Sequence, residues 1–153
     1  MMLTDERCCT SSITIQVEAD KLLEFMSNPL KIGQWGFGSW GEIEDMGDGI
    51  YVGTSLFDGG KTSFRVNTYR KFRQVDYEVG YLGGELLPWI VARVNHGPIV
   101  GLSEHESLLT MLAWRHQQWS DEDWRLLSAT HETEVFRIRY LAELEYGTKS
   151  KKE

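Results

Sequence analysis

The 153-residue sequence has few cysteines, few basic residues and no long apolar run. Its two cysteines, Cys8 and Cys9, are adjacent. Neighbours of this kind rarely form a structural disulfide, so a reducing cytoplasm is the expected location. No group of histidine and cysteine has the spacing of zinc ligands, and we expect neither a metal nor another cofactor.

Basic residues number 16 against 23 acidic residues, which gives a net charge of -7. This balance argues against nucleic acid and against anionic membrane surfaces as partners, because both recruit basic patches. No apolar run approaches the roughly 20 residues of a membrane span. The start of the chain carries Asp5 and Glu6 and lacks the apolar centre of a secretory signal.

The chain is long enough for one domain with a core and with room for a cavity. Six Trp, six Tyr and six Phe make it slightly rich in aromatic residues. Aromatic side chains commonly line small-molecule pockets, although ordinary core packing explains any single ring at least as well.

The first third of the chain changes its pattern twice. Residues 1–10 are polar and expected to be loose. Residues 12–18 alternate between apolar and polar side chains, which predicts a strand with one wet face. Residues 19–27 then adopt helical spacing, and Asn28-Pro29 ends that helix because the residue before a proline avoids the α region. A second short helix is expected over residues 30–35.

The middle of the chain predicts consecutive antiparallel strands separated by glycine-containing turns, of which Asp58-Gly59-Gly60 is the strongest hairpin signal. The expected strands are Glu42–Met46, Ile50–Phe57, Thr62–Tyr69, Phe72–Tyr81, Leu86–Asn95 and Ser103–His116.

A single amphipathic helix of about 37 Å is predicted over residues 121–145. Ser120 is its expected N-cap, and three acidic residues follow in the first turn. Spacings of three and four define an inward stripe formed by Trp124, Leu127, His131, Val135, Ile138 and Ala142. A second apolar line, Phe136, Tyr140 and Leu144, predicts that the sheet clasps the helix over a broad arc.

This order of elements resembles the START/polyketide-cyclase-like (SRPBCC) superfamily, which includes the birch-pollen-allergen-like proteins. Two segments carry the resemblance, IQVEADKLLEFMSNPLKIGQW near the start and SDEDWRLLSATHETEVFRIRYLAELE near the end. Pro29 and Trp35 fall where the family has a proline break and a tryptophan. The likeness is one of architecture, because the superfamily shares no catalytic signature.

The resemblance implies an α+β helix-grip domain over residues 11–146, with loose termini at 1–10 and 147–153. In such a domain a curved antiparallel sheet of six or seven strands wraps around the C-terminal helix, and two short helices follow the first strand. It also implies a mostly apolar cavity between sheet and helix. Members bind lipids, sterols, polyketides, plant hormones or aromatic compounds, and a minority are enzymes.

His131 is the sharpest candidate for chemistry, because it is the polar member of the inward stripe. An imidazole there can donate to a ligand carbonyl or act as a general acid or base. A partly buried histidine that bonds a strand carbonyl is the simpler interpretation. Glu134 either joins His131 on the same face or points to solvent.

The other expected ligand contacts are Trp35, Phe37, Tyr77, Val79, Tyr81, Met111, Leu127 and Val135, and core packing explains each about equally well. Among the polar groups, the Tyr77 and Tyr81 hydroxyls need partners if they are buried. The alternation around Arg93 leaves its strand face open, and we favour the outer face. No catalytic triad, phosphate loop or metal spacing is present in the sequence.

Two functions follow as hypotheses. The first is a cavity protein that binds a small hydrophobic or aromatic molecule, in transport, sensing or an unassigned role. The alternative is a polyketide-cyclase or dehydratase-like enzyme with His131 as general acid or base. The sequence is also compatible with a homodimer.

Overall fold

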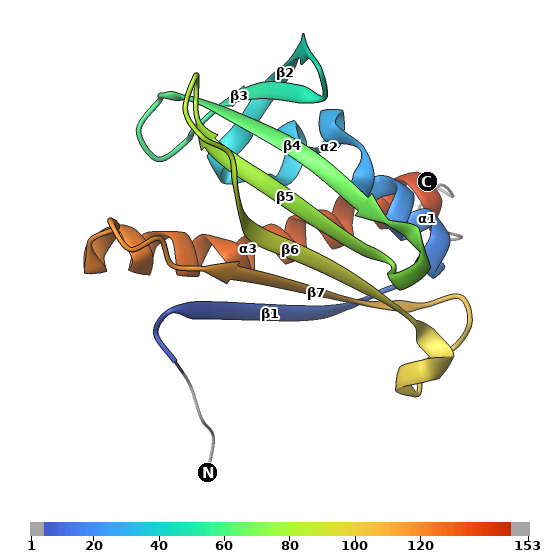
Figure 1. Ribbon diagram of the computed structural model, residues 1–153. Helices are drawn as coiled ribbons and strands as arrows, with labels where there is room; N and C mark the ends of the chain where they lie inside the picture. The colour runs from blue at the N-terminus through green and yellow to red at the C-terminus, as the bar shows by residue number, and fades with distance from the viewer. Residues whose placement is uncertain (1–4, 148–153) are drawn as a thin grey trace.

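The computed structural model describes residues 5–147, which form one seven-stranded antiparallel sheet and three α-helices. The sheet order is β1-β7-β6-β5-β4-β3-β2, so the first strand pairs with the last. All three helices lie on one side of the curved sheet (Figure 1). The predicted helix-grip architecture is therefore confirmed.

The elements are β1 (Cys8–Ile15), α1 (Ala19–Ser27), α2 (Pro29–Trp35), η1 (Phe37–Ser39), β2 (Trp40–Gly47), β3 (Ile50–Thr54), β4 (Lys61–Tyr69), η2 (Arg70–Phe72), β5 (Gln74–Tyr81), β6 (Leu87–His96), η3 (Gly97–Val100), β7 (Ser107–Trp114) and α3 (Asp121–Tyr146).

The first strand begins earlier than we expected. Residues 8–10 pair with residues 112–114 of β7, so they belong to the sheet and not to a loose terminus. The alternating pattern predicted a strand that begins at Ser12. In the structure the strand begins at Cys8 and includes the polar residues Thr10 and Ser11. Residues 1–4 and 148–153 of the expected loose termini lie outside the described residues.

Side-chain caps fix two helix boundaries. Asn28 ends α1 and starts α2, where its side-chain oxygen accepts a hydrogen bond of 3.0 Å from the Leu30 amide. The Ser120 hydroxyl accepts a bond of 3.1 Å from the Asp123 amide and starts α3 as predicted. Such caps satisfy amide groups that have no partner within the helix.

A glycine lets α2 lie directly against the sheet. A Cβ placed on Gly33 would stand 2.0 Å from the carbonyl oxygen of Gly41 in β2. Only a residue without a side chain permits this approach. Gly33 thereby positions the adjacent end of α2, including Trp35, over the interior.

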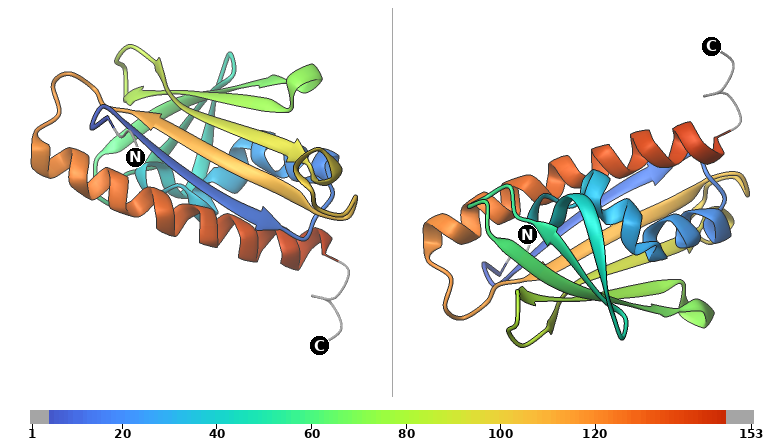
Figure 2. Two further views of the ribbon diagram at one scale, coloured as in Figure 1. Left: turned by 90° about the horizontal axis from the view of Figure 1, so that it is seen from below. Right: turned by 90° about the horizontal axis from the view of Figure 1, so that it is seen from above.

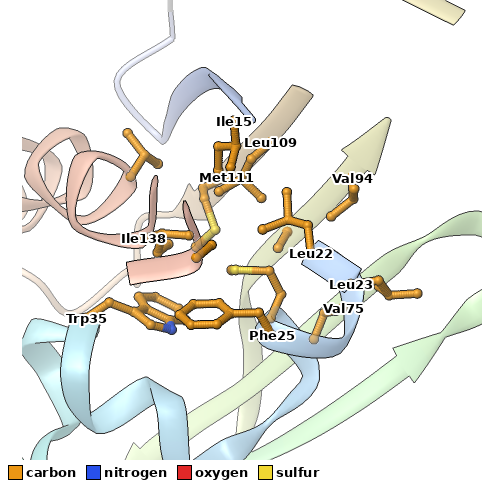
Figure 3. Close-up of a cluster of buried hydrophobic side chains, with 14 of the residues drawn as sticks. Ile15, Leu22, Leu23, Phe25, Trp35, Val75, Val94, Leu109, Met111 and Ile138 are labelled. Atoms are coloured by element: carbon orange, nitrogen blue, oxygen red, sulfur yellow. The ribbon is translucent and has the colours of Figure 1, made fainter. Parts of the chain in front are cut away.

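The core lies between the concave face of the sheet and the three helices. Side chains from β1, α1, β7 and α3 converge there, including Ile15, Phe25, Met111 and Ile138 (Figure 3). The predicted inward stripe of α3 is confirmed, because Trp124, His131, Val135, Ile138 and Ala142 are buried. Leu127, the sixth member of that stripe, is half-buried.

The second apolar line of α3 is not clasped by the sheet, so that prediction is wrong. Phe136, Tyr140 and Leu144 are 50%, 60% and 46% exposed. They lie on the opposite side of the helix from its buried residues, which are Trp124, His131, Glu134, Val135, Ile138 and Ala142. Apolar spacing locates a helix face, but it does not tell whether another part of the same chain covers that face.

Candidate functional site

His131 lies almost fully inside the protein. Its side chain sits on the buried face of α3 and is 2% exposed as a residue. Within residues 5–147, neither Nδ1 nor Nε2 has a hydrogen-bond partner. The strand carbonyl or hydroxyl expected under the simpler interpretation does not bond this ring. Burial lowers the pKa of His131 from 6.5 to about 4, so the imidazole is neutral at neutral pH.

Glu134, one turn later, shares the buried face with His131. It is 8% exposed, and its Oε2 accepts a hydrogen bond of 2.8 Å from the Phe37 amide in η1. Burial raises the pKa of Glu134 from 4.5 to about 8, although the Phe37 bond acts in the opposite direction. The carboxyl group is therefore mostly protonated at neutral pH, and Glu134 does not point to solvent.

The two groups are close without being bonded. Nε2 of His131 lies 3.9 Å from Oε1 of Glu134, beyond the range of a hydrogen bond. Because both groups are neutral near pH 7, this contact is not an ion pair. The arrangement places a protonated acid beside an imidazole that can both donate and accept.

Trp35 supplies a third buried polar atom without a partner. The residue is 4% exposed, and its Nε1 makes no hydrogen bond within the described part of the chain. Its ring meets that of Tyr77 edge-on, with centroids 5.8 Å apart. The Tyr77 hydroxyl donates a bond of 2.6 Å to the Met26 carbonyl at the end of α1. That hydroxyl is thus committed to the fold, and burial raises the pKa of Tyr77 well above 10.

Sequence reasoning missed Cys9 at this site. Cys9 is half-buried where β1 passes α3, and its thiol interacts with Ser128. Burial raises the pKa of the Cys9 thiol, which disfavours the reactive thiolate form. Cys9, Ile13 and Ile15 are separated by even numbers of residues, so in a strand their side chains point to the same face. This spacing could have predicted that Cys9 faces the core.

The structure brings several of the predicted ligand contacts together. Trp35, Tyr77, Met111 and Val135 belong to one buried cluster, and Val79 packs against it. Phe37 and Leu127 are half-buried, and the Phe37 ring meets the Trp40 ring edge-on at 5.6 Å.

Tyr81 lies on the surface instead of the interior. It shares strand parity with Tyr77, but it is the last residue of β5 and is 70% exposed. Burial decreases along β5 after Tyr77, so that alternation alone does not predict the exposure of its last residue. Arg93 is exposed on the outer face of β6, as we favoured, while Ala92 and Val94 face the core.

Two hollows lie on the surface, away from His131. One of about 270 Å³ is polar and is lined by residues near the start of α1, Arg73, His96 and residues 104–105. The other, of about 320 Å³, is apolar and lies between β2, β3 and the β5–β6 loop. None of the nine predicted ligand contacts lines either hollow.

Two further properties concern residues 5–147. No three His, Cys, Asp or Glu side chains in this range gather in a way that could hold a metal ion. No helix in this range is both long and apolar enough to cross a membrane.

Solved structures with the same architecture are numerous at low sequence identity. A START superfamily protein from Mycobacterium smegmatis superposes with a TM-score of 0.66 at 10% identity, covering 90% of this chain and 98% of its own. The Zhui aromatase/cyclase from a Streptomyces species gives 0.63 at 16% identity, covering 91% and 94%. The Aha1 dimer from Colwellia psychrerythraea gives 0.61 at 13% identity, covering 92% and 98%.

The chain has the START/polyketide-cyclase-like (SRPBCC) fold. No sequence-family model matches it, and no curated protein shows detectable sequence similarity to it. At these identities the START-like fold carries no residue roles from one protein to another. The chemistry has to be argued from His131, Glu134 and Trp35 themselves.

Proposed function

We propose that this START-like protein binds a small hydrophobic or aromatic molecule between the sheet and α3, with a polar atom of that molecule on His131. The observation that carries the proposal is the unpartnered His131 ring, which is 2% exposed. An unsatisfied buried polar group costs roughly 1–3 kcal/mol. A ligand oxygen that accepts from or donates to the ring recovers that free energy.

The surroundings support an uncharged ligand. Glu134 is held by the Phe37 amide through Oε2, which leaves Oε1 as the oxygen that can carry the acid proton toward the interior. Trp35 Nε1 is a second unsatisfied donor. Trp35 belongs to the same buried apolar cluster as Met111 and Val135. Neutral donors in an apolar setting favour a ketone, phenol or similar oxygen over a carboxylate.

A titration tests this proposal directly. We expect 1-naphthol to bind one molecule per chain by isothermal titration calorimetry, and native mass spectrometry of the purified protein to reveal a co-purified small molecule. His131→Phe should weaken 1-naphthol binding by about tenfold or more, equivalent to roughly 1.4 kcal/mol. The matched control is His105→Phe, because His105 is exposed and lies outside α3, beside the polar surface hollow and away from His131. Equal affinities of the two variants would refute a role for His131.

A second candidate, a cyclase- or dehydratase-like enzyme, is favoured by one observation. Burial raises the pKa of Glu134 to about 8 and lowers the pKa of His131 to about 4. Oε1 of Glu134 lies 3.9 Å from Nε2 of His131. Paired groups of this kind serve as acid and base in enzymes. Glu134 would donate the proton to a ligand carbonyl, and the neutral His131 would accept one.

The two candidates separate in a turnover assay. Under the enzyme hypothesis, Glu134→Gln abolishes conversion of a bound poly-β-ketone while its binding persists. If the unmodified protein binds the poly-β-ketone without converting it, the enzyme hypothesis is rejected and the ligand-binding function is retained.

A further inference from the structure

The outward side of α3 carries a continuous line of small and apolar side chains. We call it the outer stripe, and it consists of Leu126, Ala129, Thr133, Phe136, Tyr140 and Leu144. At 100° per residue these positions fall within a sector of about 80°. The buried residues of the helix occupy the opposite side.

The outer stripe is long and exposed. From Leu126 to Tyr140, which are 50% and 60% exposed, it extends about 21 Å along the helix. Both views in Figure 2 show that no helix or strand of the described residues lies over this side of α3. Extended exposed apolar patches of this kind mark interaction sites in soluble proteins.

We propose that the outer stripe is a homodimer interface, in which α3 of one protomer packs antiparallel against α3 of its partner around a two-fold axis. A two-fold interface must be complementary to itself, since each residue pair occurs twice. The stripe meets this condition when the helices are centred between Glu134 and Val135. Ala129 then lies opposite Tyr140 of the partner subunit, and Thr133 lies opposite Phe136 of the partner subunit, so that small side chains face large ones.

The charges along one edge of the stripe agree with the same register. Glu132 and Arg139 flank the stripe on the same side, at helical positions about 20° apart. In the antiparallel register, Glu132 and Arg139 of the partner subunit lie on the same side of the interface, offset by about 3 Å along the helix axis, and the pair is repeated by symmetry. The Arg139 guanidinium lies 5.2 Å from the centroid of the Phe136 ring, beside the apolar line. The net charge of -7 disfavours an anionic membrane as the alternative occupant.

Sedimentation velocity over a concentration series tests the interface. We expect the purified protein to pass from monomer to dimer between about 1 µM and about 1 mM, the range of transient interfaces. Phe136→Glu should weaken dimerisation by about tenfold or more. The matched control is Phe72→Glu, because Phe72 is 56% exposed on η2 and Phe136 is 50% exposed on α3. The control should leave the dimerisation constant unchanged.

A charge exchange tests the register. Glu132→Arg alone and Arg139→Glu alone each place like charges across the interface, so each variant should be monomeric where the unmodified protein is dimeric. An equimolar mixture of the two variants restores opposite charges at both pairs and should yield a heterodimer. Circular dichroism of each variant checks that α3 is intact.

Several results would overturn the proposal. They are a monomer at every concentration, equal effects of Phe136→Glu and Phe72→Glu, or a mixture that stays monomeric. A monomeric protein that binds phosphatidylcholine vesicles through Phe136 would instead make the stripe a lipid-binding face, and it would likewise refute the dimer.

Discussion

Nε2 of His131 and Oε1 of Glu134 face each other across 3.9 Å on the buried side of α3. The separation is too long for a hydrogen bond, and burial keeps both groups uncharged near neutral pH. A fold stabilised by burial gains nothing from the His131 ring, whose two nitrogens have no hydrogen-bond partner within residues 5–147. The proposed ligand contact rests on this ring, and the shifted pKa values of His131 and Glu134 predict a distinctive dependence of stability on pH.

Glu134 should make the protein less stable as the pH rises from about 6.5 to 8. The folded carboxyl keeps its proton up to about pH 8, whereas the unfolded one loses it near 4.5. A raised folded pKa means that stability is full at low pH and is lost as the pH approaches 8. His131 opposes this only between pH 4 and 6.5, because its lowered folded pKa removes stability as the pH falls.

Glu134→Gln should therefore flatten the upper part of the profile. Above pH 6.5 the slope attributable to Glu134 is at most about 1.4 kcal/mol per pH unit. Urea unfolding at pH 6.5, 7.25 and 8 measures it, with exposed Glu132→Gln as the control. A slope that survives in Glu134→Gln would show that another group titrates.

Ser120→Ala should lower the stability by about 1 kcal/mol. The change removes the bond of 3.1 Å that the Ser120 hydroxyl accepts from the Asp123 amide at the start of α3. Thr133→Ala on the exposed side of the same helix is the control, and it should be neutral or slightly stabilising, since alanine is the better helix former. Thermal unfolding compares the two, and equal melting temperatures would argue against the cap.

Gly33→Ala should destabilise the protein although alanine favours helices. The added Cβ would stand 2.0 Å from the Gly41 carbonyl oxygen, so α2 has to move away from β2. Overpacking of this kind costs about 1–3 kcal/mol. Gly38→Ala is the control, because a Cβ at Gly38 meets nothing within 4 Å. A neutral Gly33→Ala in chemical unfolding would contradict the close approach of α2.

Local signals in the sequence located most of the fold. The helix over residues 19–27 and the start of α3 at Asp121 agree with the structure, because each is set by neighbouring residues such as Asn28, Pro29 and Ser120. Strand faces were also predictable from alternation, as for Ala92 and Val94 against Arg93. These features depend on chemistry within a few residues.

The features that sequence reasoning missed depend on distant parts of the chain. Tyr81 has the parity of an inward residue, yet at the end of β5 it is exposed. Phe136 and Tyr140 have helical apolar spacing, yet nothing in the described residues covers them. The burial of Glu134 depends on the Phe37 amide, 97 residues away in sequence. Local patterns define faces, whereas long-range packing decides which faces are covered.

His131→Leu should stabilise the protein while it weakens ligand binding. Leucine replaces a ring whose two nitrogens have no partner within residues 5–147 by an apolar side chain of comparable reach. Removing buried polar atoms of this kind is worth about 1–3 kcal/mol. The decrease in stability between pH 6.5 and 4 should also become smaller. In the unmodified protein this decrease arises because unfolded His131 takes up a proton at a higher pH than folded His131, and leucine does not titrate.

A gain in stability together with a loss of ligand affinity in His131→Leu would show that His131 serves binding and not core packing. Guanidinium unfolding at pH 7 measures the gain in stability, and calorimetry with 1-naphthol measures the loss of affinity. His105→Leu, at an exposed position, should change neither. A residue that serves binding at a cost in stability is expected to give a more stable protein with weaker binding when it is replaced. If His131→Leu instead unfolded the protein, the ring would be a structural part of the core, and the proposed ligand contact would lose its main support.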